Sequence, residues 1–463
     1  VADGLHQSPL QREDVRARRR DVEDALLDLV DVLPAQHVMA TLGQQLALEF
    51  DAYTRAGGES AGEAAWQALE APIHAFRALC RHFMLCSNAS KGPLGESDPS
   101  VRPALEAQVG QFAQMLLAVR GCSDLRYSAV LALGRYAEML RDHPDVLAPM
   151  LQNIVADLAM PAVAPAAAIA FRNVCEACAP ALAQLYVANI LAVYQQCSVL
   201  APAEQREITH GVTLVLRRLP YAACADAVDA VVAPIRAALD AVIASGNPQS
   251  AEAGAIQGYL QRMLSLLEAM PDVHNPDNTH VMTRLVDIVE SMSAHLAQLI
   301  RMFPPEDARV DSACQWWKYT LVAAQVHAQK LVPSLCTTLC EAFAHTQQSV
   351  FVYVAGVIVR TFPPGQYSNL CFDPREVAAK FLEYFVPPVL TAISRDASFA
   401  DSHPDLCEDV IGFLLVYADW CPDLLVASPL LPPVLTAISG MLGVTNKYLF
   451  YIVVDFLCAL YKA

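Results

Sequence analysis

The chain has 463 residues, 55% of them hydrophobic and only 19 of them glycine, and its 48 acidic and 31 basic side chains leave a formal net charge of −17. A single compact core of this length would exceed the size at which protein cores stop growing, so several domains or a repeat array are expected. The charge argues against direct binding to nucleic acid, because phosphate is bound by basic surfaces, and it complements a basic protein partner.

Fourteen cysteines are scattered along the chain, and a chain of this length does not need disulfides in order to fold. We therefore expect reduced thiols and a cytosolic or nuclear protein. The purest apolar run, Ser349–Val359, is shorter than the roughly 18–20 residues that span a membrane, so no membrane insertion is expected. No phosphate loop, nucleophile motif or paired-carboxylate motif is recognisable, which predicts that the chain is not an enzyme and needs no cofactor.

The first element is an arginine-rich stretch, residues 12–30, which continues into a helical stripe of apolar residues. A nuclear-localisation or nucleic-acid-binding segment would be one interpretation. Acidic residues interleave directly after the arginines, however, so we interpret the stretch as the solvated start of a helix that packs through Leu26 and Val30.

Apolar residues then recur at helical spacing along most of the chain, and prolines fall mostly between the stripes. Residues 124–144 and 145–160 predict two successive helices. The next two helices are predicted at 165–179 and 180–197, with Pro180 at the hinge between them. Further helices are predicted at 203–219, 224–244, 310–329 and 333–344.

The octamer PPVLTAIS occurs twice, at Pro387–Ser394 and at Pro432–Ser439, 45 residues apart. On a helix its prolines suit the first turn, and its valine, leucine and isoleucine share one face. The spacing lies within the roughly 40–47 residues of HEAT-type helix-pair repeats. We therefore predict an all-α superhelical solenoid of antiparallel helix pairs, with about ten repeats in one continuous array over residues 1–463.

Two cysteine pairs have helical spacing: Cys175 with Cys178, and Cys336 with Cys340. Each pair could donate two metal ligands, but zinc requires four, and no partner pair lies nearby in the sequence. Core packing is the better interpretation, so no metal site is predicted. The adjacent Trp316 and Trp317 are likewise assigned to the core, with a contact to cargo as the alternative.

Four segments, in the same order, resemble importin-β-type nuclear transport receptors: Ala64–Leu79, His143–Leu182, Gly211–Pro220 and Ser402–Leu425. The second segment, with its Asn-x-Cys-x-x-Cys pattern from Asn173, is similar to the transportin-SR and importin-thirteen branch. The resemblance covers nearly the whole chain, from about Val15 to its end.

The resemblance implies a karyopherin that shuttles between cytoplasm and nucleus, binds protein cargo on a concave surface, is emptied by RanGTP and contacts nucleoporins. In this family Ran docks mainly on the amino-terminal repeats. Because the chain starts at Val1 and stops inside an apolar helix, we expect a fragment that lacks those repeats and the carboxy-terminal end.

The cargo implied for this branch is a basic or arginine-serine-rich tail, often phosphorylated, as in splicing factors. Glu408 and Asp409 lie at the paired acidic positions of the family, and Asp405 precedes them by one turn. Carboxylates can bind arginine in bidentate geometry. The alternative for this pair is stabilisation of a helix start, since acidic residues in the first turn complement the helix dipole.

The family's arginine-rich helix corresponds to residues 309–324, but here Ser312, Gln315 and Lys318 stand where arginines are expected, and Arg309 lies at the edge. The resemblance therefore predicts that Asp405, Glu408, Asp409, Arg309 and Lys318 bind cargo, and it leaves a different basic cargo equally open.

Two other functions fit a helical repeat array. One is a scaffold for a protein complex, such as a phosphatase or vesicle-coat scaffold, and the other is a regulatory domain of a larger enzyme. The order of the family segments favours the transport receptor.

Overall fold

The computed structural model describes residues 9–58, 62–87, 101–120, 122–141, 143–271, 278–304, 307–396, 398–443 and 445–462. These segments form helices and turns with no β-strand among them, which confirms the predicted all-α solenoid. The contacts divide the chain into two compact units, Val1–Leu219 and Pro220–Ala463. A single array of about ten repeats stays a prediction.

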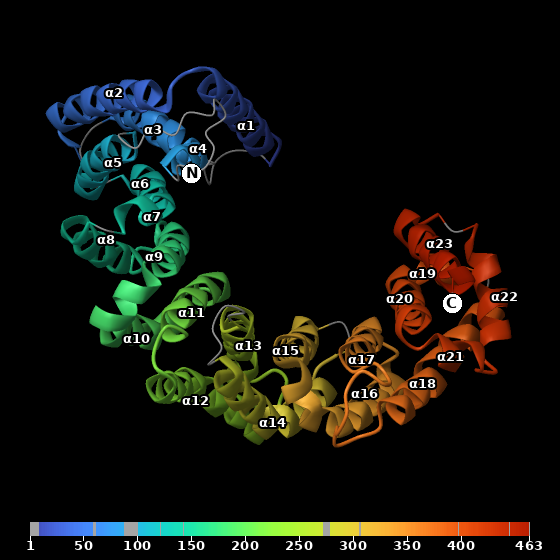
Figure 1. Ribbon diagram of the computed structural model, residues 1–463. Coiled ribbons are helices and arrows are strands. Elements are labelled where there is room, and N and C mark those ends of the chain that lie inside the picture. The colour runs from blue at the N-terminus through green and yellow to red at the C-terminus, as the bar shows by residue number, and fades with distance from the viewer. Residues whose placement is uncertain are drawn as a thin grey trace. The chain divides into compact units, whose positions relative to one another are not determined.

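Unit 1 consists of helices in two layers (Figure 1). α3, α6, α9 and α11 stack side by side in one layer, and α2, α5 and α8 stack in the other. The helices are α1 (Pro9–Val32), α2 (Ala35–Arg55), α3 (Glu63–Ala78), α4 (Cys80–Ser87), α5 (Val101–Ala118), α6 (Ser123–Arg135), α7 (Ala137–Leu140), α8 (Pro144–Asp157), α9 (Ala164–Leu185), α10 (Val187–Gln196), the 3₁₀ helix η2 (Cys197–Val199) and α11 (Pro202–Leu216).

The predicted start of the chain is confirmed as a helix that packs weakly. In α1, Val30 is buried, whereas Val22 and Leu29 remain exposed. The arginine-rich part is a solvated helix face at Arg18 and Arg20, and Arg19 forms an ion pair with Glu70 of α3 at 3.3 Å.

The layer of α6, α9 and α11 is held at close range by small residues. At Gly134 of α6, a Cβ atom would lie 2.6 Å from the Cα of Ala170 in α9. At Gly211 of α11, it would lie 3.0 Å from the Cα of Arg172. Only glycine fits at such distances, because no side chain separates the two helix backbones.

A buried ion pair joins α6 to the other layer of unit 1. Arg126 of α6 forms an ion pair with Asp157, the last residue of α8, at 2.8 Å. The same guanidinium donates hydrogen bonds to the backbone oxygens of Leu116, in the last turn of α5, and of Val119, which follows that helix, and to the side chain of Asn153. Both charged groups are almost fully buried, so each depends on the other for compensation.

Unit 2 repeats the same two-layer arrangement. α13, α15, α17, α20 and α23 form one layer, and α12, α14, α16, α18 and α22 form the other. The helices are α12 (Tyr221–Ser245), α13 (Ala251–Ala269), α14 (Asn278–Met302), α15 (Ala308–Ala324), the 3₁₀ helix η3 (Gln325–Leu331), α16 (Val332–Thr346), α17 (Ser349–Thr361), α18 (Pro374–Arg395), α19 (Phe399–Ser402), α20 (Pro404–Trp420), α21 (Pro422–Val426), α22 (Leu431–Met441) and α23 (Lys447–Lys462).

Side-chain caps fix where several of these helices begin. Ser250 accepts a hydrogen bond from the backbone N–H of Ala253 at the start of α13. At the starts of α15 and α18, the side chains of Asp307 and Asp373 each accept a hydrogen bond from the backbone N–H of the residue two positions later. Each cap satisfies one of the backbone donors that a helix start leaves free.

Two predictions about prolines are wrong. Pro180 does not mark a hinge, because α9 runs through it to Leu185. The first octamer does not begin a helix either, since Pro387 and Pro388 lie inside α18. In both places buried side chains continue past the proline, at Leu182 and at Val389, and this packing outweighs the backbone hydrogen bond that each proline removes.

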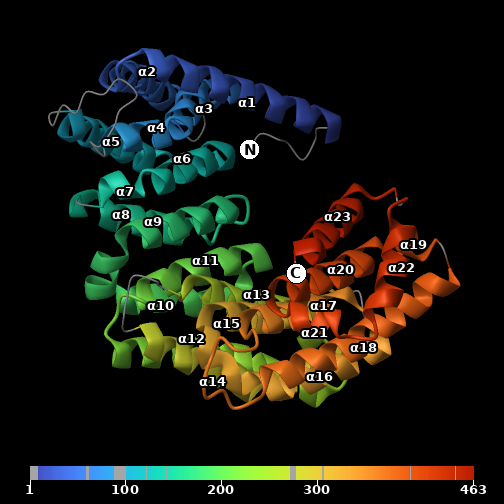
Figure 2. The same ribbon diagram turned by 45° about the vertical axis from the view of Figure 1, so that its right-hand side comes forward.

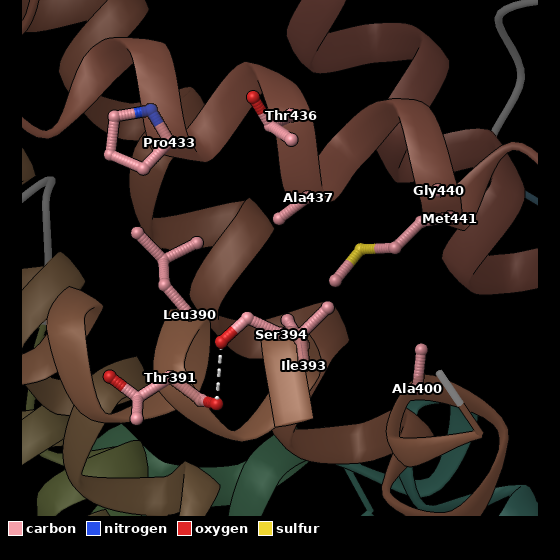
Figure 3. Close-up of a pocket in the computed structure, with 10 residues that line it drawn as sticks. All are labelled: Leu390, Thr391, Ile393, Ser394, Ala400, Pro433, Thr436, Ala437, Gly440 and Met441. Carbon is pink, nitrogen blue, oxygen red and sulfur yellow. Dashed lines mark hydrogen bonds between the residues drawn. The ribbon is translucent and has the colours of Figure 1, made fainter. Parts of the chain in front are cut away.

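The second octamer does begin a helix, as predicted, with Pro432 in the first turn of α22. The two octamers lie side by side and line one groove between α18 and α22 (Figure 3). The groove has a volume of about 560 Å³, and its apolar wall includes Leu390, Ile393 and Met441. The repeated octamer thus occupies equivalent positions in neighbouring helix pairs.

The assignment of the tryptophans and of the two cysteine pairs to the core is confirmed. Both tryptophans of α15 are fully buried, and Trp316 donates a hydrogen bond from Nε1 to the backbone oxygen of Leu260 at 3.0 Å. The cysteine pairs are buried as well: Cys175, Cys178, Cys336 and Cys340. Among the described residues, no group of three or more His, Cys, Asp or Glu side chains is placed to bind a metal ion.

Two of the described helices, α9 and α18, have the length and composition to span a membrane. Each packs against neighbouring helices of its own layer, α9 against α6 and α11, and α18 against α16 and α22. Core helices give the same weak signal, and the absence of membrane insertion stays a prediction.

Candidate functional site

One layer of unit 2 carries all five predicted cargo residues, on α15 and α20. In Figure 1 the layer of α13, α15, α17, α20 and α23 lies on the inside of the curve that unit 2 makes. We call the solvent-exposed side of this layer the inner face. Three pairs of neighbouring helices in it run parallel, because their contacting positions advance together along both helices. The contacts are Ala253–Arg309 and Leu260–Trp316 for α13 and α15, Ser349–Asp409 and Gly356–Phe413 for α17 and α20, and Asp401–Thr445 and Gly412–Ile452 for α20 and α23.

Three acidic residues lie in the first two turns of α20, and we call Asp405, Glu408 and Asp409 the acidic triad. Asp405 is exposed, and the other two are half-buried. No described basic residue forms an ion pair with any of the three, whereas acidic residues elsewhere do pair, as Glu341 does with Arg301. The triad is therefore a concentration of negative charge without a counter-ion in the described part of the chain.

The pKa of Asp409, a member of the triad, is shifted by its surroundings. Its pKa is raised from 3.8 to about 6, mainly by burial and also by the neighbouring charges of Glu408 and Asp405. A hydrogen bond from the Ser349 hydroxyl, at the start of α17, opposes the shift. At neutral pH the side chain is still ionised, so the fold holds a carboxylate in an unfavourable environment.

This pKa predicts that Asp409→Asn stabilises unit 2 at neutral pH. A raised pKa means that the folded chain binds the proton more tightly than the unfolded chain, so the contribution of Asp409 to stability is present at low pH and is lost as the pH rises through about 6. We expect the variant to be more stable by about 1–2 kcal/mol at pH 7.5 and to differ less at pH 5. Urea unfolding at the two pH values measures this difference.

Asp405→Asn is the matched control on the same helix. Asp405 lies in the first turn of α20, where its charge complements the helix dipole, so its loss should cost about 0.3–1 kcal/mol. Equal gains from both variants would show that total charge, rather than the buried position of Asp409, sets the effect.

Lys318 lies on the inner face two helices away from the triad, on α15. Its ammonium stands over the ring of Tyr353 of α17, 5.1 Å from the ring centroid. Tyr353 is 38% exposed and follows Ser349 by one helical turn. Lys318, Tyr353 and the triad thus belong to α15, α17 and α20, three successive helices of one layer (Figure 2).

Arg309 is occupied within the chain. Its guanidinium forms a two-point contact with Asp307, donates to the backbone oxygen of Ala253 at 2.8 Å, and stacks 3.6 Å above the ring of Phe303. These contacts join the start of α15 to α13. A role for Arg309 in cargo binding stays a prediction, and the geometry favours a structural role.

The far side of the triad has residues that sequence reasoning missed. Lys447 and Tyr448 begin α23, and the lysine ammonium lies 4.9 Å from the centroid of the Tyr448 ring. Tyr448 is 61% exposed. The only signal in the sequence was the lysine-tyrosine pair at the start of an apolar helix. The pair lies beside α20 because α23 stacks against α20.

Comparison with known proteins identifies two segments of the chain. Residues 113–192 match the third TPR domain of the transportin-3/importin-13 family, and residues 284–390 match the fourth. An uncharacterised protein of Schizosaccharomyces pombe is 26% identical over 303 residues, which are 64% of this chain and 29% of the yeast protein.

Solved structures share the fold. The chain is similar to importin-13 in its cytosolic state, with a TM-score of 0.77 and 15% identity over 98% of this chain and 48% of that one. It is also similar to importin-β crystallised from polyethylene glycol, with a TM-score of 0.51 and 12% identity over 96% of this chain and 60% of that one. The chain therefore spans less than two thirds of the length of the relatives that it matches.

Proposed function

Because its two matched domains place the chain among importin-β-type karyopherins of the transportin-3/importin-13 branch, we propose that it is part of a nuclear transport receptor that binds basic protein cargo on the inner face of unit 2. The observation that carries the proposal is the acidic triad, which has no counter-ion among the described residues and lies on the inside of the curve of unit 2. An arginine-rich segment would supply the missing positive charge.

Arginine-serine-rich segments, as in splicing factors, are the proposed cargo. Arginines would pair with Glu408 and Asp409, and Lys318, whose ammonium lies over the ring of Tyr353, would meet a phosphate group. RanGTP and nucleoporins are the proposed further partners of the whole receptor, which would shuttle between cytoplasm and nucleus and would perform no catalysis. A scaffold for a protein complex is the second candidate, because two-layer helix stacking alone serves either role.

Fluorescence anisotropy with a labelled arginine-serine peptide, phosphorylated and unmodified, tests the proposal. We expect the wild-type protein to bind the arginine-serine peptide. The double variant Glu408→Lys/Asp409→Lys should bind it at least tenfold more weakly, because the charge reversal replaces attraction by repulsion at the point of contact. Both measurements are made at low and moderate salt, since contacts between exposed charges weaken as salt increases.

Asp226→Lys/Glu383→Lys is the control. It makes the same change in net charge at exposed positions on α12 and α18, in the other layer, and should weaken binding less than twofold. An equal loss in both double variants would mean that the peptide senses only the total charge. No binding to the unmodified chain would favour the scaffold.

A further inference from the structure

We propose that Tyr353 and Tyr448 make the acidic surface of unit 2 selective for arginine over lysine. This inference rests on the proposed function, that the triad binds a basic segment, and it assigns the specificity of that site to two aromatic rings. The two rings stand on opposite sides of the triad, one on α17 and one on α23.

Tyr353 is placed beside Asp409 by the register of α17 and α20. The Ser349 hydroxyl contacts the Asp409 carboxylate, and further along the helices Gly356 contacts Phe413. Side chains on a helix lean towards its amino-terminal end, so the ring of Tyr353 leans over the turn that contains Ser349. The ring therefore borders the carboxylate of Asp409.

Tyr448 is placed beside Glu408 by the register of α20 and α23. Thr445 donates hydrogen bonds from its backbone N–H and its hydroxyl to Asp401, before α20, and Gly412 contacts Ile452. Since the helices are parallel, the residues one turn before this last contact, Glu408 and Tyr448, lie opposite each other.

Both rings have a face that binds a cation. The ammonium of Lys318 lies 5.1 Å from the centroid of Tyr353, and that of Lys447 lies 4.9 Å from the centroid of Tyr448. Distances within about 6 Å are those of cation–π contacts. The chain's own lysines thus mark both rings as cation-binding, and the two rings enclose the triad between them.

An arginine from the partner suits this arrangement better than a lysine. Its guanidinium is planar, so it can lie on a tyrosine ring while its edge donates two hydrogen bonds to a carboxylate. A lysine ammonium is a compact, strongly hydrated charge without such a plane. The surface therefore fits an extended segment that carries arginine, and its negative charge supplies the complementarity.

The span of the surface sets the length of this segment. From α15 to α23 there are three helix spacings, each of about 8–10 Å, which gives about 24–30 Å. An extended chain advances about 3.3–3.6 Å per residue, so about eight residues cross the surface. A peptide of this length with arginine at its centre is the probe that the geometry specifies.

The test compares two unmodified peptides that differ only in having arginine or lysine at every basic position. Binding is measured by anisotropy with the unmodified chain, with Tyr353→Leu/Tyr448→Leu and with Tyr353→Phe/Tyr448→Phe. We expect about a tenfold preference for arginine in the unmodified chain, because exposed cation–π contacts contribute modestly and two rings act together. The leucine variant should bind the two peptides within about twofold of each other, and the phenylalanine variant should keep the preference.

Tyr384→Leu is the matched control, since Tyr384 of α18 is also exposed and has the Lys380 ammonium 6.0 Å from its ring centroid, but lies in the other layer. It should leave both affinities unchanged. Equal binding of the two peptides to the unmodified chain, or a preference that survives the leucine variant, overturns the inference while the proposed function stands. If neither peptide binds the unmodified chain, the proposed function fails and the inference falls with it.

Discussion

Arg126→Ala is expected to destabilise unit 1 by about 3–5 kcal/mol, the cost of removing one partner from a buried ion pair. The substitution leaves the Asp157 carboxylate buried without its counter-ion, and it removes one hydrogen-bond donor from each of the backbone oxygens of Leu116 and Val119. The free energy of unfolding of a typical domain is about 5–15 kcal/mol, so the loss is a large part of the total stability. Urea unfolding followed by circular dichroism measures it.

Two further variants separate the causes. Arg301→Ala removes one partner of an exposed pair, Arg301 with Glu341, and should change stability by less than about 0.5 kcal/mol. Arg126→Met/Asp157→Leu replaces both buried charges by apolar side chains and should recover at least half of the loss. If Arg126→Ala costs no more than Arg301→Ala, the Arg126–Asp157 pair does not stabilise the contact between the two layers.

Gly134→Ala is expected to destabilise unit 1 by about 2–3 kcal/mol, although alanine is the better helix former. Alanine in place of glycine normally stabilises a helix interior by about 1 kcal/mol. Here the added Cβ would lie 2.6 Å from the Cα of Ala170 and 2.7 Å from its Cβ. Backbone atoms cannot move aside alone, so α9 must shift as a whole, and overpacking of this kind costs more than the propensity gains.

Gly110→Ala, on α5 of the same unit, is the matched control with the opposite sign. No atom lies within 4 Å of a Cβ placed there, so the substitution should stabilise by about 0.5–1 kcal/mol. The shift of the thermal midpoint should therefore differ in direction between the two variants. Stabilisation by both would mean that α6 and α9 approach each other less closely than the structure has them.

The predictions from sequence succeeded where a residue's environment follows from local periodicity. The cysteine pairs were assigned to the core because no second ligand pair for zinc lies nearby in the sequence, Trp316 and Trp317 were assigned to it as well, and all are buried. The prolines at 180 and 387 were wrongly predicted to interrupt or begin helices. Local chemistry argues for a helix break there, but burial of the following residues against neighbouring helices keeps the helix intact.

For the candidate site, the sequence indicated residue types but not their neighbours. Glu408 and Asp409 were named from a resemblance, but nothing in the sequence showed that Asp409 would be half-buried beside Ser349 with a pKa of about 6. Arg309 looked like an exposed basic residue at a helix edge, whereas contacts with Asp307, Ala253 and Phe303 occupy it.

By itself, the sequence determined the helical class and the resemblance to the transportin-3/importin-13 family, because these depend on periodicity and on short motifs read along the chain. Only the tertiary structure decided which side chains meet. Tyr353, Asp409 and Tyr448 are separated by 56 and 39 positions in the sequence, yet they lie on three adjacent helices. That adjacency follows from helices that skip their sequence neighbours and stack on the next member of the same layer, which no local pattern records.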